Sequence, residues 1–261
     1  MSKTVKAWLI AAAALVIVGS LLFFGVMMAY RWDFTRLNTV RHETKTYEIS
    51  EAFSGVTVRA QTADILFSPS VDGACRVICS DRETVAYSVG VEDGTLTVSA
   101  EDGGKWIDRV GIDFCPSEIT VYLPEAQYGS LVAQTTTGDI VVGDLTAETL
   151  ELSVSTGSVT VSDVSCKNLL STGSTGDVTL KNVIAAEKLS LERKTGDIRF
   201  DGSDAAEVLV KTTTGDVAGD LLSAKVFVTE TSTGSVRVPQ TTAGGTCRIT
   251  TTTGDIEIEA P

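Results

Sequence analysis

Residues 135–140 read TTTGDI, and six related segments follow them at a nearly constant interval. They read STGSV (155–159), STGDV (174–178), KTGDI (194–198), TTGDV (213–217), STGSV (232–236) and TTGDI (252–256). The seven glycines of these segments are spaced by 19, 19, 20, 19, 19 and 20 residues. Such a constant period indicates a chain built from stacked structural repeats.

A tight turn is expected at each of these glycines. Glycine adopts positive φ without penalty, and the Asp or Ser that follows it can bond to the turn backbone. A second turn is expected about six residues later, at Asp144, Asp163, Asn182, Gly202 and Asp220. We predict a structural turn motif formed by Thr137, Gly138, Thr156, Gly157, Thr175, Gly176, Thr195, Gly196, Thr214, Gly215, Thr233, Gly234, Thr253 and Gly254.

Apolar residues recur in four columns when the repeats are aligned on the glycine. They stand two and four residues after it, as in Ile140 and Val142, and seven and five before it, as in Leu150 and Leu152. Alternation with a period of two predicts two short strands per repeat, each with one apolar face. One coil cannot bury this face alone, so coils must stack in parallel at about 4.8 Å.

The sequence therefore predicts an all-β chain: a parallel β-solenoid, right-handed by the usual crossover rule, with coils of 19–20 residues. A sandwich of hairpins is the alternative, and the constant period argues against it. Residues 131–261 form the regular coils, and residues 51–130 form irregular, strand-rich first coils that contain a degenerate echo of the motif at 62–65. We expect Glu257, Glu259 and Pro261 on the open edge, where charge and proline oppose polymerisation.

Residues 7–30 contain no charged side chain and predict one transmembrane helix. Residues 1–6 would then be a short cytoplasmic N-terminus, and residues 31–50 a juxtamembrane linker. A cleavable signal peptide is the competing interpretation. The run is long for a signal peptide and its cleavage pattern is poor, so we favour an uncleaved signal anchor. Basic residues flank both ends, so an extracytoplasmic solenoid is expected from the protein class rather than from flanking charge.

The helix, the lead-in ITVYLP at 119–124 and the seven glycine motifs together resemble the bacterial putative-adhesin family, whose domain of unknown function consists of β-strand repeats. The resemblance covers residues 50–259. It implies a membrane-anchored, cell-surface β-helix-like repeat protein and carries no catalytic residues. The chain departs from the pattern at Arg193 and Lys194, where the Thr or Ser positions before the motif become basic.

The composition excludes several kinds of chemistry. A net charge of −13 argues against nucleic acid as a partner. The single histidine, His42, lies in the expected linker, so no Ser-His-Asp, Cys-His or histidine metal site is expected on the solenoid. The five cysteines do not form a disulfide framework, although a pair between Cys115 and Cys75 or Cys79 is open. No cofactor and no catalytic residues are expected.

Two groups of residues are candidate binding sites. A column of carboxylates could bind calcium, but turn capping is the simpler interpretation; its members are Asp139, Asp177, Asp197, Asp216 and Asp255. A basic patch of Arg193, Lys194 and Arg199 could contact a partner.

The sequence favours a non-enzymatic cell-envelope protein, an adhesin or interaction scaffold. It would contact the membrane through residues 7–30 and bind an unknown protein or glycan ligand. The alternatives are a carboxylate-based polysaccharide-active enzyme on a β-helix and a membrane-anchored regulator or sensor in envelope signalling.

Overall fold

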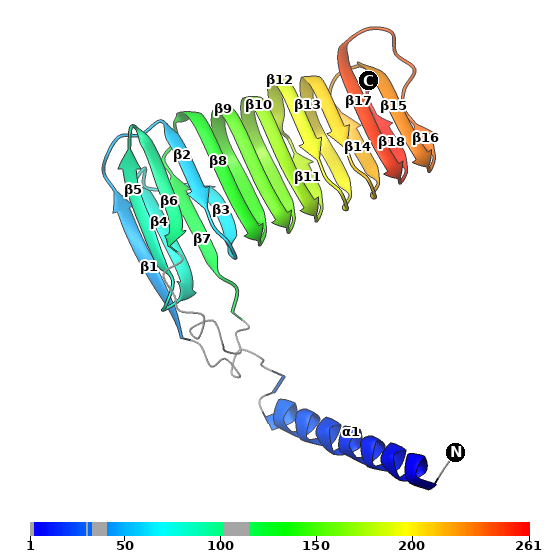
Figure 1. Ribbon diagram of the computed structural model, residues 1–261. Coiled ribbons are helices and arrows are strands. Elements are labelled where there is room, and N and C mark those ends of the chain that lie inside the picture. The colour runs from blue at the N-terminus through cyan, green and yellow to red at the C-terminus, as the bar shows by residue number, and fades with distance from the viewer. Residues whose placement is uncertain (1–2, 30, 33–40, 102–114) are drawn as a thin grey trace. The chain divides into compact units, whose positions relative to one another are not determined.

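The computed structural model describes residues 3–29, 31–32, 41–101 and 115–261. The described chain holds one N-terminal helix and a single 18-stranded sheet (Figure 1). It divides into two compact units, residues 1–42 with 104–115, and residues 43–103 with 116–261. The expectation of a mostly-β protein with one N-terminal helix is therefore confirmed.

The helix, α1, spans Lys3–Ala29. Its segment Trp8–Ala29 has a mean hydropathy of 2.7 and none of its 18-residue apolar window is buried within the protein. An unburied apolar helix of this length fits a membrane span, and an N-terminal signal sequence has the same features. Tyr30 and Arg36, which belong to the expected span and its flank, lie outside the described residues.

The strands follow in chain order. They are β1 (His42–Ile49), β2 (Gly55–Arg59), β3 (Asp64–Pro69), β4 (Cys75–Arg82), β5 (Ala86–Glu92), β6 (Thr95–Glu101), β7 (Glu118–Leu123), β8 (Gln127–Thr137), β9 (Ile140–Thr156), β10 (Val159–Thr175), β11 (Val178–Lys181), β12 (Ile184–Glu192), β13 (Ile198–Lys211), β14 (Val217–Leu221), β15 (Lys225–Thr233), β16 (Val236–Arg237), β17 (Gly245–Thr253) and β18 (Ile256–Glu259).

Successive repeats stack in parallel, with matching columns in register. Leu131 of β8 pairs with Leu150 of β9, and Leu150 pairs with Leu169 of β10. The side chains of these three leucines are at most 1% exposed, because each is covered by the same column in the coils on both sides. We call this array, residues 55–69 and 127–261, the coil stack.

The second turn of the repeat is a bend within a continuous strand in three coils, whereas at Asn182 it separates β11 from β12. Asp144, Asp163, Asn182 and Gly202 have φ between 49° and 61°, and β9, β10 and β13 each run through this bend. The twenty-residue interval between Gly176 and Gly196 appears as a bulge. The offset between β10 and β12 is 19 residues at Cys166↔Ala185 and 20 at Asn168↔Lys188.

The last two coils are stacked out of chain order. β17 and β18 lie between the coil of β13 and β14 on one side and the coil of β15 and β16 on the other. The expectation that Glu257 and Glu259 stand on the open edge is therefore wrong: Glu257 pairs with Ala218 and with Arg237. The outermost coil is the one formed by β15 and β16 (Figure 1).

The N-terminal part of the sheet also differs from a regular series of coils. β2 and β3 form one coil that pairs in parallel with β8 and β9. In the segment between β3 and β8, β6 pairs in parallel with β2, and β7 pairs in parallel with β3. Strand β6 also pairs antiparallel with β5, and β7 pairs antiparallel with β4.

Strand β1 lies within residues 31–50, which the sequence predicts as a linker, and it pairs with β4. Tyr47 and Ile49 of β1 pack against the core, so their alternation is the signal that the linker interpretation overlooked.

Candidate functional site

The Thr-Gly turns stack directly on one another, and this contact requires glycine. Gly157 donates its N–H to the carbonyl of Thr175 at 2.9 Å, and the same bond recurs along the stack. The φ of Gly157 is +144°, and a Cβ there would lie 2.1 Å from the carbonyl oxygen of Gly138. The glycine is thus needed for its φ and for close backbone approach between coils.

Where an aspartate follows the glycine, its carboxylate accepts a hydrogen bond from the neighbouring coil rather than from its own turn. Oδ1 of Asp139 accepts the backbone N–H of Ser158 at 2.7 Å, and Oδ1 of Asp177 accepts that of Asp197 at 2.8 Å. Asp197, Asp216 and Asp255 repeat this bond. Asp64 makes the same bond to Asp139, so the motif at 62–65 is a true member of the series.

This ladder gives the candidate calcium residues a structural task. One carboxylate oxygen of each accepts an N–H of the adjacent coil, and the pKa of Asp255 is lowered chiefly by its bond from the backbone of Ser235. Among the described residues, no group of three or more His, Cys, Asp or Glu side chains is placed to hold a metal ion. The geometry supports turn-to-turn capping.

The expected basic patch does not form as a unit, because Arg193 is a core residue. Its side chain is 1% exposed, whereas Lys194 and Arg199 are exposed. Arg193 occupies the column three residues before the glycine, which also points inward at Val154 and Thr212. Its Nη2 donates to Oγ of Ser171 at 3.0 Å, and its Nη1 donates to the carbonyl of Glu192 at 3.0 Å.

Small residues in the preceding coil make room for this guanidinium. A Cβ at Gly173 would lie 2.7 Å from Nη1 of Arg193, and Ser171 stands where other coils have Leu152 or Leu191. Burial lowers the pKa of Arg193 to about 10. The inward column together with Gly173 and Ser171 is the sequence signal that could have identified Arg193 as buried.

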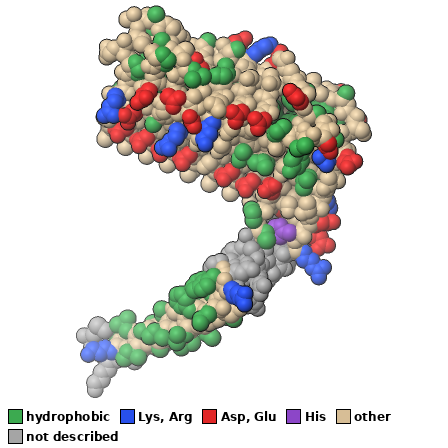
Figure 2. Space-filling view, turned by 180° about the vertical axis from the view of Figure 1, so that it is seen from behind, with side chains coloured by type: hydrophobic (Ala, Val, Ile, Leu, Met, Phe, Trp, Pro, Cys, Tyr) green, Lys and Arg blue, Asp and Glu red, His purple; other side chains and the backbone are tan. Residues whose placement is uncertain are grey.

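The exposed faces of the stack carry charges of both signs. Figure 2 shows acidic and basic side chains interspersed along one side of the stack. Ion pairs between adjacent coils join Lys167 to Glu148 at 2.6 Å and Lys211 to Glu192 at 3.1 Å. These pairs are solvent-exposed, so each adds little stability.

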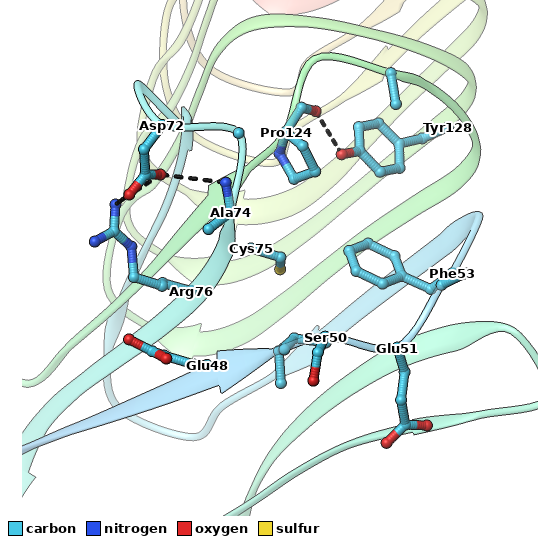
Figure 3. Close-up of a pocket in the computed structure, with 14 residues that line it drawn as sticks. Glu48, Ser50, Glu51, Phe53, Asp72, Ala74, Cys75, Arg76, Pro124 and Tyr128 are labelled. Atoms are coloured by element: carbon cyan, nitrogen blue, oxygen red, sulfur yellow. Dashed lines mark hydrogen bonds and ion pairs between the residues drawn. The ribbon is translucent and has the colours of Figure 1, made fainter.

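A pocket of about 540 Å³ lies at the N-terminal part of the sheet. Three segments line it: residues 48–53 at the end of β1 and beyond it, residues 72–76 at the start of β4, and residues 124–128 at the start of β8. Figure 3 shows Asp72 and Arg76 on one side, Phe53 and Tyr128 on another, and Cys75 between them. No sequence motif marked these residues, because the pocket joins segments far apart in the chain.

The aromatic side of the pocket consists of two stacked rings. The rings of Phe53 and Tyr128 stack with centroids 6.1 Å apart and an interplanar angle of 21°. The hydroxyl of Tyr128 donates to the carbonyl of Pro124 at 2.7 Å. Burial raises the pKa of Tyr128 to about 12, so its hydroxyl keeps its proton at neutral pH.

The polar side of the pocket is held by one carboxylate. Asp72 accepts bonds from Oγ of Ser70 at 2.8 Å, the N–H of Ala74 at 3.2 Å and Nη2 of Arg76 at 3.0 Å. The bond from Ser70, then that from Ala74, lowers the pKa of Asp72. Glu48 and Glu51 add two further carboxylates, although Figure 3 shows Glu51 directed away from the ring pair.

The cysteines offer no reactive thiolate here. Cys75, Cys79, Cys166 and Cys247 are buried, and the five cysteines form no disulfide with one another. Burial raises the pKa of Cys75 to about 11, so the pocket cysteine is a thiol at neutral pH. His42 begins β1 and does not line the pocket.

Parallel stacking of repeats and turns built on glycine define a β-strand repeat protein, and the chain adds an N-terminal apolar helix long enough to span a membrane. A comparison with protein families matches residues 53–261 to the Toastrack DUF4097 family. The match spans most of the chain, and the chain belongs to this family. The resemblance to putative-adhesin domains is thereby confirmed.

Solved bacterial structures are similar to this chain at low sequence identity. A putative adhesin of Bacteroides fragilis is 17% identical, with a TM-score of 0.49 and coverage of 84% of this chain and 97% of that chain. A putative adhesin of Parabacteroides distasonis is 14% identical, with a TM-score of 0.47 and coverage of 84% and 98%. A putative lipid binding protein of the same species is 17% identical, with a TM-score of 0.38 and coverage of 85% and 98%. A search of curated proteins finds no match.

Proposed function

We propose that this chain is a membrane-anchored, non-enzymatic interaction protein that displays a β-solenoid outside the cell membrane. The observation that carries the proposal is the combination of an unburied apolar helix with a domain of stacked repeats in one chain. Its repeated polar side chains, exemplified by Asp139 and Asp177, are engaged in bonds between coils rather than grouped for catalysis. A rigid, elongated surface of this kind is typical of display and recognition.

The proposed organisation has residues 1–6 inside the cell, residues 7–30 across the membrane and the strands from β1 onward outside. Right-handed winding and retention of the helix are parts of this proposal. Limited proteolysis of intact cells tests the topology: the coil stack should be cleaved from outside, with an N-terminal fragment left in the membrane. Protection in intact cells together with cleavage in lysates would place the stack inside. N-terminal sequencing of the membrane fraction tests retention of the helix, because signal cleavage would begin the chain after residue 29.

We propose the pocket as the contact point for a glycan ligand. A stacked aromatic pair offers an apolar surface, and Glu48 with the Asp72–Arg76 pair offers acceptors and donors for hydroxyl groups. The half-buried Phe53 is the residue whose removal should weaken binding most.

A glycan array probed with the detergent-solubilised protein tests this assignment. Phe53→Ala and Glu48→Gln should weaken binding, while Glu83→Gln, at an exposed acid outside the pocket, should not. Equal glycan binding by all three variants would show that the pocket is not the contact point for the glycan.

A polysaccharide-active enzyme is the second candidate, because Glu48, Glu51 and Asp72 place three carboxylates around one pocket. Release of reducing ends from a bound polysaccharide, lost in Glu48→Gln and Asp72→Asn, would favour it over the binding protein.

A further inference from the structure

The coil of β15 and β16 is the last layer of the stack, and it leaves a strand edge open. β15 pairs along its length with β17, from Lys225↔Gly245 to Thr233↔Thr253. No register is found, among the described residues, between the other edge of β15 and any strand. An edge strand directs alternate N–H and C=O groups away from its sheet, where another strand can pair with them.

The apolar core is also open at this layer. The column two residues after the glycine is at most 1% exposed at Ile198, Val217 and Ile256, but Val236 is 45% exposed. Phe227 is half-buried, whereas its column neighbours Val208 and Cys247 are at most 1% exposed. Val228 of the same coil is 50% exposed and belongs to an outward column, where it pairs in register with the exposed Arg248. Terminal repeats of stacked proteins normally carry a polar outer face. This one has Thr229 and Thr231 in two inward columns but leaves Phe227 and Val236 partly exposed.

The opposite end of the stack is covered. The coil of β2 and β3 is overlaid by β6 and β7, and Val56 and Ile65 are at most 1% exposed. Beyond these strands the pairing is antiparallel, through β5 and β4. The two ends therefore do not match, and head-to-tail growth of parallel coils has no partner surface.

Charge does not oppose the meeting of two such ends. The whole chain has a net charge of −13. The charged residues between positions 225 and 238 are Lys225, Glu230 and Arg237 alone. Lys225 is buried and paired with Asp204 at 2.6 Å, and Arg237 is paired with Glu257. The local surface is thus free of the acidic excess found in the rest of the molecule.

We propose that the open layer is a homodimer interface, at which β15 of one copy pairs antiparallel with β15 of a second copy. A twofold interface places the same surface on both partners, which suits an edge of backbone donors and acceptors beside exposed valines. Pro239 follows β16 closely and lacks an N–H, so β15 supplies the longer usable edge. Pairing would cover Val228 and close the core over Phe227 and Val236.

Sedimentation of the full-length protein in detergent tests the proposal across a range of concentrations. The wild type should be a dimer, and the double variant Val228→Lys/Val236→Lys should weaken dimerisation by about tenfold or more. Both residues are exposed in a single copy, so the variant should fold and keep the wild-type circular dichroism spectrum. Leu170→Lys is the matched control, because Leu170 is an exposed apolar residue in the middle of the stack.

A cysteine variant distinguishes this interface from association through α1. Val228→Cys in a Cys115→Ser background should form a covalent dimer on mild oxidation, and Leu170→Cys in the same background should not. A monomeric wild type would overturn the proposal. So would a dimer that survives the double lysine variant, which would place the contact elsewhere, or a foreign protein strand found on β15 of a monomeric chain.

Discussion

The guanidinium of Arg193 occupies the space that a side chain at Gly173 would fill: a Cβ added to Gly173 would lie 2.7 Å from Nη1 of Arg193. The two residues belong to adjacent coils, and the cation is held by Ser171 and by the carbonyl of Glu192. Among the described side chains, Nε of Arg193 is one of two buried polar nitrogen or oxygen atoms without a hydrogen-bond partner. The large buried side chain of Arg193 is thus accommodated because Gly173, in the adjacent coil, has no side chain.

Replacement of Arg193 should show that volume matters more than charge at this position. Arg193→Ala leaves a cavity and should lower the free energy of unfolding by about 2–4 kcal/mol. Arg193→Met fills most of the space without a buried charge and should stay within about 1 kcal/mol of the wild type. Urea denaturation of these variants measures both effects.

Arg199→Ala is the control for this comparison, because Arg199 is an exposed basic residue on the next strand and its loss should change stability by less than about 0.5 kcal/mol. Equal destabilisation by Arg193→Ala and Arg199→Ala would contradict the burial of Arg193.

The stacked turns should tolerate no side chain at their glycines. Gly157→Ala forces a Cβ to 2.1 Å from the carbonyl of Gly138 at a φ of +144°, and should destabilise the protein by about 2–3 kcal/mol or more. Gly143→Ala is the matched control, since its nearest contact would be 4.0 Å away and its φ is ordinary. Thermal unfolding compares the two, and a Gly157→Ala protein as stable as Gly143→Ala would refute the close approach.

One carboxylate of the ladder, that of Asp255, should make stability depend on pH under acidic conditions. The pKa of Asp255 is lowered in the folded state by bonds from Ser235, so its contribution is present above the unfolded value of about 3.9 and is lost as the pH falls through the folded pKa. The stability difference between the wild type and Asp255→Asn should therefore shrink as the pH is lowered from 6 towards 2. Glu83→Gln, at an exposed acid away from the ladder, should show no such trend.

Engineered disulfides should report the order of the last coils. Lys211 and Thr250 pair in register on adjacent strands, so Lys211→Cys/Thr250→Cys should form a bond readily. Lys211 and Glu230 lie two coils apart, about 9.6 Å at a spacing of 4.8 Å, so Lys211→Cys/Glu230→Cys should not. Non-reducing electrophoresis of both variants measures the outcome. The reverse result would mean that the last coils are stacked in the order in which they occur in the sequence.

Much of the architecture is readable in the sequence, because each repeat carries its own turn chemistry and alternation. The glycine turns, the apolar columns and the bend at Asp144 were expected and are found. The same period-two alternation of inward and outward residues predicts strand β1 and an inward Arg193. The polar composition of residues 31–50 and the charge of Arg193 favour the linker and the exposed patch instead, and both of these predictions are wrong. The pocket could not be anticipated, since its walls come from three segments between residues 48 and 128 that meet only through strand pairing.

The period of the repeat, the inward columns and the need for glycine at each turn follow from the residues themselves, since they depend on contacts that every coil makes identically. The order of the coils does not follow from them. Ile256 can pair with Val217 or with Val236 equally well, because every coil offers its neighbour the same columns and the same backbone donors and acceptors. Only the folded arrangement settles that β17 and β18 lie inside and that β15 stands at the open edge.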